Sequence, residues 1–268
     1  MTPFSSPRPA VLACHGLSMT YRTASGPLPA LRDVSFTVGA GELVCVVGPS
    51  GCGKTTLLKL LAGLLTPSSG SVVTAPPPPG RPANALMFQE HALFPWMTVL
   101  ENVTFALDGN GAGRRGRLDR AREFVERVGL TQFGAAYPHQ LSAGMRQRVA
   151  LARVLARNPY VWLMDEPFGA LDGQTRLLLQ EELLRTWEAH QQSILFVTHD
   201  IDEGVRLADR ILVMTGRPGT MREQVVVTLP RPRQPLVGDG EAAEIKCRIW
   251  RLLEDEVRKT LYSPRAER

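Results

Sequence analysis

The sequence predicts an α/β fold with a mostly parallel core sheet, and two patterns carry this prediction. Short runs of consecutive apolar residues, typical of strands buried on both faces, alternate with longer segments of helical periodicity. These runs occupy residues 43–47, 85–88, 160–164, 193–197, 211–214 and 225–229. Polar residues directly follow several of the runs, at the carboxyl ends where α/β sheets hold their ligands.

The stretch before the first buried run has a different pattern. From residue 12 onward it contains short alternating runs interrupted by glycines, which predicts antiparallel strands and turns beside the core sheet. Tyr21 lies in a polar part of this stretch. An exposed tyrosine there would stack on a nucleotide base, and the alternative is a strand-edge tyrosine that fills a local gap.

The first buried run leads into the sequence GPSGCGKT at residues 48–55 and then into leucines at helical spacing. This pattern between a strand and a helix predicts a phosphate-binding loop whose backbone N–H groups surround a polyphosphate. Lys54 would reach the β- and γ-phosphates, and the Thr55 hydroxyl would ligate Mg²⁺. Cys52, near the helix N-terminus, is expected to have an acidified thiol whose alkylation ATP blocks. The expected nucleotide contacts of this segment are Gly48, Pro49, Ser50, Gly51, Cys52, Gly53, Lys54, Thr55 and Thr56.

Composition limits the classes of partner. The chain has 268 residues, a net charge of +5 and four cysteines without metal-ligand spacing, which is typical of a protein in a reducing cytoplasm. No apolar run approaches the ~20 residues that cross a bilayer, so a role at a membrane requires another subunit. The mild positive charge predicts no nucleic-acid partner. Arginines gathered at residues 114–122 indicate a solvated helix face, with an anionic membrane or an acidic partner as the weaker alternative.

A helical insert is predicted between the second and third buried runs. Gln89 follows the second run, and the loop after it holds the apolar residues Leu93, Phe94 and Trp96, which form either local core or a surface for a partner. Residues 99–128 have helical character with a break at 108–113. One apolar face of that segment consists of Leu118, Ala121, Val125 and Val128. Ser142 is expected to cap a helix that extends to about Arg157.

Two adjacent acids follow the third buried run. Asp165 would hold Mg²⁺, directly or through water, and Glu166 would polarise an attacking water as a general base. Stability explains such a pair poorly, because unpaired buried charge costs several kcal/mol. His199 follows the fourth run and would hydrogen-bond the γ-phosphate or the water.

In this order, the motifs resemble the ATP-hydrolysing subunit of ABC transporters over roughly residues 12–229. The resemblance implies a P-loop NTPase fold of ABC ATPase type, with an antiparallel β subdomain and a helical subdomain. It gives Tyr21 the role of adenine-stacking aromatic, Gln89 that of the Q-loop glutamine, and Glu166 that of the catalytic glutamate. It also implies a Walker A loop at 48–55, a signature at 141–145, Walker B at 161–165, a D-loop aspartate at Asp172 and a switch histidine at His199.

The resemblance further implies catalytic roles for Glu166, His199, Lys54 and Gln89, with Thr55, Gln89 and Asp165 as Mg²⁺ ligands. Ser142, Gly144 and Asp172 would contact the nucleotide bound by a second copy, which implies a homodimer that closes on ATP. The signature departs from the family pattern LSGGQ, because Ala143 and Met145 replace a glycine and the glutamine. The helix N-terminus and the Ser142 hydroxyl remain, so function is expected to be retained.

Residues 89–96, 216–219 and 229–233 resemble the branch that serves nitrate, sulfonate, taurine and bicarbonate importers. This implies a peripheral subunit at the cytoplasmic face of the inner membrane, bound to transmembrane permease subunits and, through them, to an extracytoplasmic solute-binding protein. The expected domains are an ABC ATPase domain at 12–235, with a helical subdomain at about 97–158, and a C-terminal helical extension at 236–268. In that extension Trp250, Leu253, Val257 and Leu261 would share one apolar face.

Two other functions compete with the importer subunit. The first is a soluble ABC ATPase that acts on DNA, ribosomes or cluster assembly. The absence of long heptad repeats disfavours action on DNA, and a single cassette disfavours action on ribosomes. A small P-loop kinase would leave the signature and His199 without a role. Co-purification with a multi-span membrane protein separates the soluble ATPase from the importer subunit, and ATP hydrolysis without an acceptor disfavours the kinase.

Overall fold

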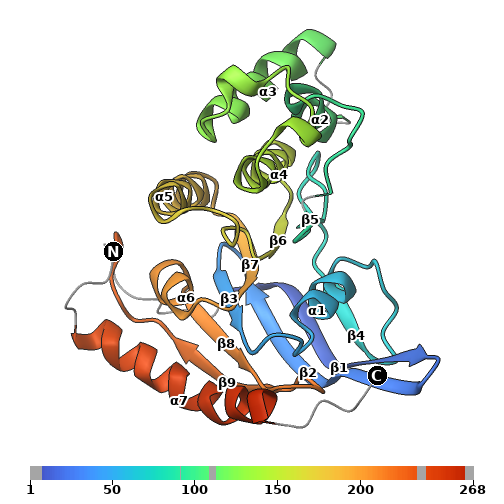
Figure 1. The fold of residues 1–268 in the computed structure, drawn as a ribbon, viewed down its shortest axis with the longest axis vertical. Helices are drawn as coiled ribbons and strands as arrows, with labels where there is room; N and C mark the ends of the chain where they lie inside the picture. Colours follow the sequence, from blue (N-terminus) through green and yellow to red (C-terminus); the bar gives the residue numbers. More distant parts are fainter. Residues whose placement is uncertain (1–7, 91, 109–112, 234–239, 263–268) are drawn as a thin grey trace. The chain divides into compact units, whose positions relative to one another are not determined.

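The computed structural model describes residues 8–90, 92–108, 113–233 and 240–262 (Figure 1). The chain divides into two units, one formed by residues up to Thr74 and from Ile194 onward, and the other by Ala75–Ser193. His91, part of the branch-specific motif, lies outside the described residues, as does the predicted domain boundary at residue 235. Within the described parts of the chain, no helix is both long and apolar enough to span a bilayer.

The first unit begins with an antiparallel sheet. β1 (Ala10–Thr23) and β2 (Gly26–Gly39) form a long hairpin, and β4 (Ser69–Thr74) pairs with the other edge of β1. The predicted antiparallel strands are therefore confirmed. Tyr21 is paired with Leu28 inside β1, beyond the part of this strand that pairs with β4. This position agrees with the strand-edge alternative for Tyr21 and does not test stacking on a base.

A second sheet of this unit carries the phosphate loop. β3 (Leu43–Val47) lies between β7 (Ser193–Thr198) and β8 (Arg210–Met214) and runs parallel to both. β9 (Met221–Val226) adds an antiparallel edge to β8, four residues earlier than predicted at its start. All five residues of β3 are buried, as a continuous apolar run predicts for a central parallel strand.

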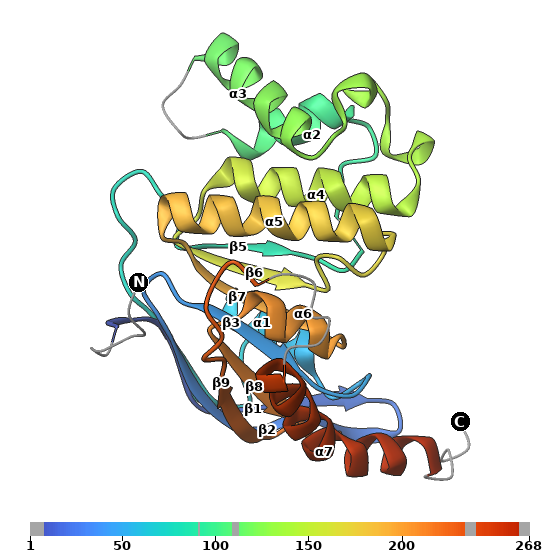
Figure 2. The same cartoon turned by 90° about the vertical axis from the view of Figure 1, so that its left-hand side faces the viewer.

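Three helices complete the first unit. α1 (Lys54–Leu61) follows the phosphate loop, and α6 (Ile201–Leu207) packs on β3. α7 (Gly240–Tyr262) packs on α6, β8 and β9 (Figures 1 and 2). Leu253 of the predicted apolar face is buried, as is Ile249, whereas Trp250 of that face is 52% exposed. The side chains of Val257 and Leu261 lie outside the described residues.

The second unit combines a parallel strand pair with helices. β5 (Asn84–Met87) pairs with β6 (Val161–Asp165), and α4 (Ala143–Arg157) and α5 (Gly173–His190) lie side by side (Figures 1 and 2). α2 (Val99–Ala106) and α3 (Arg114–Arg127) pack on each other and on α4. The short 3₁₀ turn η1 (Thr131–Phe133) packs on α3, and a second one, η2 (Pro138–Gln140), precedes α4 in the chain. The predicted helices between the second and third strand runs are confirmed; part of the predicted break, residues 109–112, lies outside the described residues.

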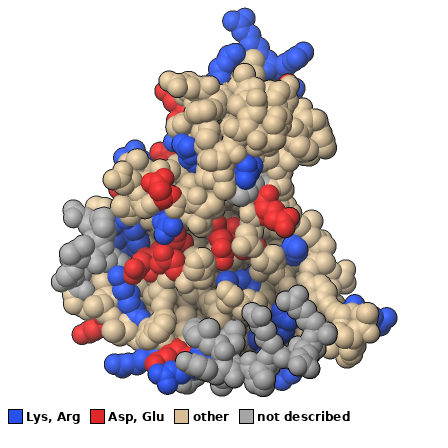
Figure 3. All heavy atoms as spheres, viewed as in Figure 1, with Lys and Arg blue, Asp and Glu red and all other residues tan. Residues whose placement is uncertain are grey.

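α3 has the two faces that its sequence predicts. On the predicted apolar face, Ala121, Val125 and Val128 are buried and Leu118 is half-buried, while Lys and Arg side chains gather over this helix at the top of Figure 3. Arg117 is the exception among the arginines, because it is half-buried and forms an ion pair with Asp108. The arginine cluster is therefore mainly a solvated helix face, as predicted.

Candidate nucleotide site

The phosphate loop has a backbone that requires glycine at two positions. Gly51 and Gly53 have φ angles of 76° and 103°, which L side chains rarely adopt. A Cβ on Gly53 would also lie 2.7 Å from Leu31 Cδ2 and 2.9 Å from the Ala30 carbonyl oxygen of β2. The loop is therefore shaped both by its own glycines and by close contact with the antiparallel sheet.

Lys54 lies inside this loop and is only 8% exposed. Its ammonium donates hydrogen bonds to the carbonyl oxygens of Gly48 at 2.7 Å and Pro49 at 3.0 Å. A lysine so deeply buried beside neutral carbonyls gains most from an anionic partner, because the low local polarity strengthens charge interactions. This geometry fits the predicted contact with a polyphosphate, whose oxygens would replace the carbonyls as acceptors.

Cys52 contradicts the prediction of an acidified thiol. Its side chain is fully buried, and burial raises the pKa of the thiol above the ordinary value of 9.0. The nearby Lys54 ammonium lowers this pKa, as expected for a cation, but the effect of desolvation is larger. The sequence places a cysteine at the start of a helix but does not reveal that its side chain faces the core.

Tyr21 and Thr56 are brought together by the fold. The Tyr21 hydroxyl lies 3.1 Å from Thr56 Oγ1, so a residue of β1 is hydrogen-bonded to the first turn of α1. This bond places the half-buried tyrosine beside the helix that begins at the phosphate loop. Its predicted stacking on adenine remains a prediction.

His199 directly follows β7, the strand next to β3, so it lies at the same sheet edge as the phosphate loop. The residues on either side of it are fixed locally. Thr198 Oγ1 donates to Glu203 Oε2 at 2.8 Å, and the Asp200 carboxylate caps α6 by accepting from Asp202 N at 2.8 Å. The exposed His199 side chain is thus carried by a rigid strand-to-helix turn.

In the second unit, β6 ends at the predicted acidic pair. Asp165 is only 4% exposed, and the next residue, Glu166, has a φ of 46°. That left-handed conformation is strained for a residue with a side chain, and such strain is concentrated at functional sites. Gln89 Nε2 lies 3.4 Å from Glu166 Oε2, so the predicted Q-loop glutamine and predicted catalytic base contact each other.

The sequence reasoning passed over Gln147, which supports the same turn. This glutamine of α4 is 4% exposed; its Nε2 donates to the Glu166 carbonyl at 2.6 Å and its Oε1 accepts from Ala170 N at 2.7 Å. One side-chain amide thus spans the turn from residue 166 to residue 170. The sequence contains no clear signal for this role, because Gln147 lies between Arg146 and Arg148 and resembles a residue of an exposed helix face.

The signature segment forms the start of α4. Ser142 is the predicted N-cap, and its hydroxyl accepts from Met145 N at 3.2 Å. A Cβ on Gly144 would lie 3.1 Å from the Ala170 carbonyl, which explains the need for a small residue there. Asp172 caps α5 by accepting from Thr175 N at 3.0 Å, and this hydrogen bond lowers the pKa of its carboxyl group.

The residues predicted to hold Mg²⁺ supply oxygen donors of the right kind. Asp165 provides a carboxylate at a strand end, and Thr55 provides a hydroxyl in the first turn of α1. Among the described residues, no group of three or more His, Cys, Asp or Glu side chains forms a metal cage. Mg²⁺ is usually held by one or two carboxylates together with substrate phosphates, so the donor set fits a metal that arrives with a nucleotide.

Comparison with known sequences identifies the family. The model of the ABC transporter family matches residues 31–169. An uncharacterized ABC transporter ATP-binding protein of Methanocaldococcus jannaschii is 44% identical, over 93% of this chain and 94% of that protein. In Synechocystis, the nitrate import ATP-binding protein NrtD is 48% identical, over 76% of this chain and 78% of that protein. The bicarbonate transport ATP-binding protein CmpD of the same organism is 43% identical, over 87% of this chain and 84% of that protein.

The solved structures agree with this assignment. The dimeric structure of a bacterial ABC transporter cassette has a TM-score of 0.73 and 30% identity, covering 81% of this chain and 98% of that chain. The same values hold for a dimeric post-hydrolysis state bound to ADP and Pi. The predicted ABC ATPase fold is therefore confirmed, and this chain belongs to the ABC transporter family as an ATP-binding, ATP-hydrolysing subunit.

Proposed function

We propose that the chain energises an importer of a small anion or organic solute. The family places it in transport, and the observation that favours this substrate class is its 43–48% identity to nitrate and bicarbonate transport ATP-binding proteins. Taurine and sulfonates belong to the same predicted class. The permease and an extracytoplasmic solute-binding protein would select the compound.

Each predicted site residue then has a task in hydrolysis. Lys54 and the backbone N–H groups of the phosphate loop hold the polyphosphate, and Tyr21 stacks on adenine. Thr55, Gln89 and Asp165 would hold Mg²⁺, which would neutralise charge on the phosphate oxygens. Glu166 accepts a proton from the attacking water, and His199 hydrogen-bonds the γ-phosphate. Positioning and electrostatic stabilisation supply most of the rate in phosphoryl transfer, so the rigidity of these supports matters directly.

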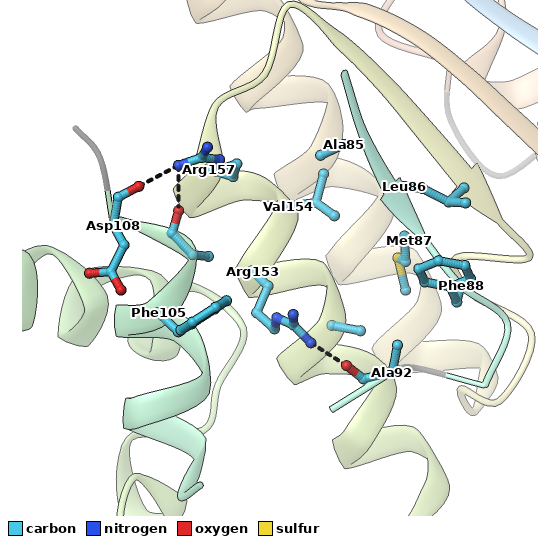
Figure 4. Close-up of a pocket in the computed structure, with 12 residues that line it drawn as sticks. Ala85, Leu86, Met87, Phe88, Ala92, Phe105, Asp108, Arg153, Val154 and Arg157 are labelled. Carbon is cyan, nitrogen blue, oxygen red and sulfur yellow. Dashed lines mark hydrogen bonds between the residues drawn. The ribbon is translucent and has the colours of Figure 1, made fainter. Parts of the chain in front are cut away.

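A pocket in the second unit is the proposed contact with the permease. It has a volume of about 360 Å³ and lies between the end of β5, α2 and α4 (Figure 4). Its lining is mostly apolar: Ala85, Leu86, Met87, Phe88, Ala92, Phe105, Ala106, Ala150 and Val154, with Asp108, Arg153 and Arg157. A concave apolar pocket with a few fixed polar groups is the usual form of a binding site for a partner side chain or short helix.

Aromatic residues at this pocket are exposed in a way that favours a partner. Phe94 packs edge-on against Phe105 at 4.8 Å between ring centroids, and Arg153 lies 5.1 Å above the Phe94 ring. Arg153 also donates to the Ala92 carbonyl at 2.5 Å, which fixes the loop after Gln89. Trp96 and Phe105 remain 69% and 45% exposed. Large exposed apolar groups beside a pocket mark interaction surfaces.

The proposed assembly has two copies of this chain at the cytoplasmic face of the membrane, attached peripherally through the permease. Each copy would use its own Lys54 and Glu166, together with Ser142 and Gly144 of its partner. The dimeric solved cassette with 30% identity supports this arrangement. ATP binding would close the pair and hydrolysis would reopen it.

The test is to express the chain with candidate permeases and to measure co-purification, followed by solute-stimulated ATP hydrolysis in vesicles. Phe105→Ser should abolish capture by the permease while leaving the basal ATPase activity of the isolated chain intact. Phe133→Ser is the matched control, because Phe133 is similarly exposed at 42% but lies outside the pocket. Basal ATPase activity without capture by any membrane protein would instead favour a soluble ABC ATPase.

A further inference from the structure

The turn that joins β8 to β9, residues 215–220, lies in direct contact with the phosphate loop. A Cβ on Gly219 would lie 2.1 Å from the Cys52 carbonyl oxygen, so the two backbones touch. Gly219 N donates to the Ala30 carbonyl at 2.9 Å, and the Gly219 carbonyl accepts from Arg32 N at 3.0 Å. The turn is therefore bonded to β2 and packed against the loop at the same point.

The two ends of this turn, Thr215 and Thr220, are hydrogen-bonded to each other. Thr215 N donates to the Thr220 carbonyl at 3.1 Å, and the two hydroxyl groups lie 2.9 Å apart. With both ends joined, residues 216–219 have little freedom to move independently of the sheet. A displacement on one side of the turn should therefore also displace the residues on its other side.

α7 holds the opposite side of the turn through Glu256. The Glu256 carboxylate accepts from Gly216 N at 2.9 Å, and it lies 3.8 Å from the Arg222 guanidinium. The side chain is only 13% exposed, so the hydrogen bond is shielded from water. A single carboxylate thus connects the C-terminal helix with the backbone that touches the phosphate loop.

Arg217 lies at the tip of the phosphate loop. Its Nη2 is 3.9 Å from the position that a Cβ on Gly51 would occupy, and the residue is exposed. Guanidinium groups pair with phosphate oxygens through two parallel hydrogen bonds, and they keep their charge at any physiological pH. A cation at this place adds to the field that Lys54 and the N-terminus of α1 present to an anion.

We infer that Arg217 is a further nucleotide-binding residue of the phosphate site, and that Glu256 of α7 is its positioning residue. Glu256 fixes the turn, and the turn holds the Arg217 guanidinium beside the loop where a polyphosphate binds. This gives the C-terminal helix a role in ATP affinity. The inference rests on the proposed role of the phosphate loop and is independent of the importer assignment.

The first experiment measures equilibrium binding of a fluorescent ATP analogue to the full chain. Arg217→Gln should weaken binding about threefold to tenfold at low salt, which is about 0.7–1.4 kcal/mol. The difference should shrink as ionic strength rises, because salt screens exposed charges. Arg217→Lys should retain part of the affinity, because it keeps the charge but not the two parallel hydrogen bonds. An unchanged affinity, or a loss that is equal at all salt concentrations, would overturn the inference for Arg217.

The second experiment separates the hydrogen bond of Glu256 from its charge. Glu256→Ala should weaken binding about as much as Arg217→Gln. Glu256→Gln should bind at least as well as the parent chain, because the amide oxygen still accepts from Gly216 N and a negative charge near an anion is removed. Glu254→Ala is the matched control, since Glu254 pairs with Arg258 one turn along α7. Equal losses in the Ala and Gln variants of Glu256 would refute positioning.

A double-mutant cycle completes the test. The chain with both Arg217→Gln and Glu256→Ala should bind ATP about as well as either single variant, because the second change acts through the first. Additive losses would show that Glu256 does not position Arg217. Thermal melting of each variant checks the fold. Lys54→Ala, measured in parallel, separates the two failures: if it keeps full affinity, the phosphate loop assignment itself is wrong.

Discussion

Replacing Gln147 with leucine tests whether the turn after β6 is held in place for catalysis. The change keeps the volume and burial of the side chain but removes its bonds to the Glu166 carbonyl and to Ala170 N. The Glu166 carbonyl keeps one partner, because it also accepts from Gly169 N at 3.2 Å. The turn therefore loses its attachment to α4 but retains its internal bond.

The expected magnitudes follow from these contacts. Two hydrogen bonds at about 1 kcal/mol each give a loss of ~2 kcal/mol in stability, or roughly 4–8 °C in melting temperature. The left-handed backbone of Glu166 stores about 1–3 kcal/mol of strain. The free energy of one lost hydrogen bond is about as large as this strain energy. Without that bond, the φ angle of Glu166 should therefore relax toward negative values. We expect kcat to fall about tenfold, with little change in the KM for ATP.

Steady-state ATP hydrolysis and thermal melting measure both effects. Gln147→Glu should be at least as damaging as Gln147→Leu, because a buried carboxylate is costly and cannot donate to the Glu166 carbonyl. Gln180→Leu is the control, since Gln180 of α5 is 2% exposed and belongs to the same unit. If Gln147→Leu lowered the melting temperature without changing kcat, or if Gln180→Leu lowered kcat as much, the reasoning would be refuted.

Three further outcomes are expected. Glu166→Gln should bind ATP normally in an equilibrium assay but hydrolyse it about 10²–10⁴-fold more slowly, and normal turnover would exclude it as the base. Cys52, buried and with a raised thiol pKa, should be alkylated far more slowly than the exposed Cys247 at pH 8, as peptide mass spectrometry would reveal; faster labelling of Cys52 would contradict its burial. The carboxyl groups of Asp172 and Glu101 have pKa values lowered by hydrogen bonds at helix N-termini, from 3.8 and 4.5 respectively. The stability that these two carboxylates add is therefore complete above their ordinary pKa values and is lost as the pH falls through their lowered pKa values. Asp172→Asn and Glu101→Gln should thus make the free energy of unfolding in urea depend less on pH in the acidic range. Variants whose pH dependence equals that of the parent chain would contradict this.

Much of the fold followed from the sequence because its signals are local. A continuous apolar run such as β3 has few alternatives in an α/β protein, and Ser142 capped α4 as its side-chain chemistry predicts. Trp250 shows the limit of such patterns, because helical spacing gives a face but not which face the rest of the chain covers. The helix buries Leu253 of the predicted face together with Ile249, and it leaves Trp250 exposed.

The role of a site residue could be predicted from the sequence where residue type alone determines its chemistry. It could not be predicted where the role depends on how the side chain packs in the fold. The spacing of Lys54 and the glycines indicates a phosphate loop, since only that backbone explains both. The state of Cys52 depends on the side chains around it, which are distant in sequence. Gln147 and Glu256 are similar cases, because each acts on a backbone group 19 or 40 residues away. Such contacts leave no periodic trace in a single sequence.

The turn between Glu166 and Asp172 has a consequence for a dimer. On the proposed assembly, Glu166 serves the nucleotide of its own chain, whereas Ser142 serves that of the partner. Gln147 and the close approach of Gly144 to the Ala170 carbonyl join both groups within one unit. Docking of the partner's nucleotide on Ser142 should therefore tighten the turn that carries Glu166, which predicts positive cooperativity in ATP hydrolysis. Gln147→Leu should lower the Hill coefficient toward one, while Gln180→Leu should leave it unchanged. A cooperative Gln147→Leu variant would show that the two sites communicate by another route.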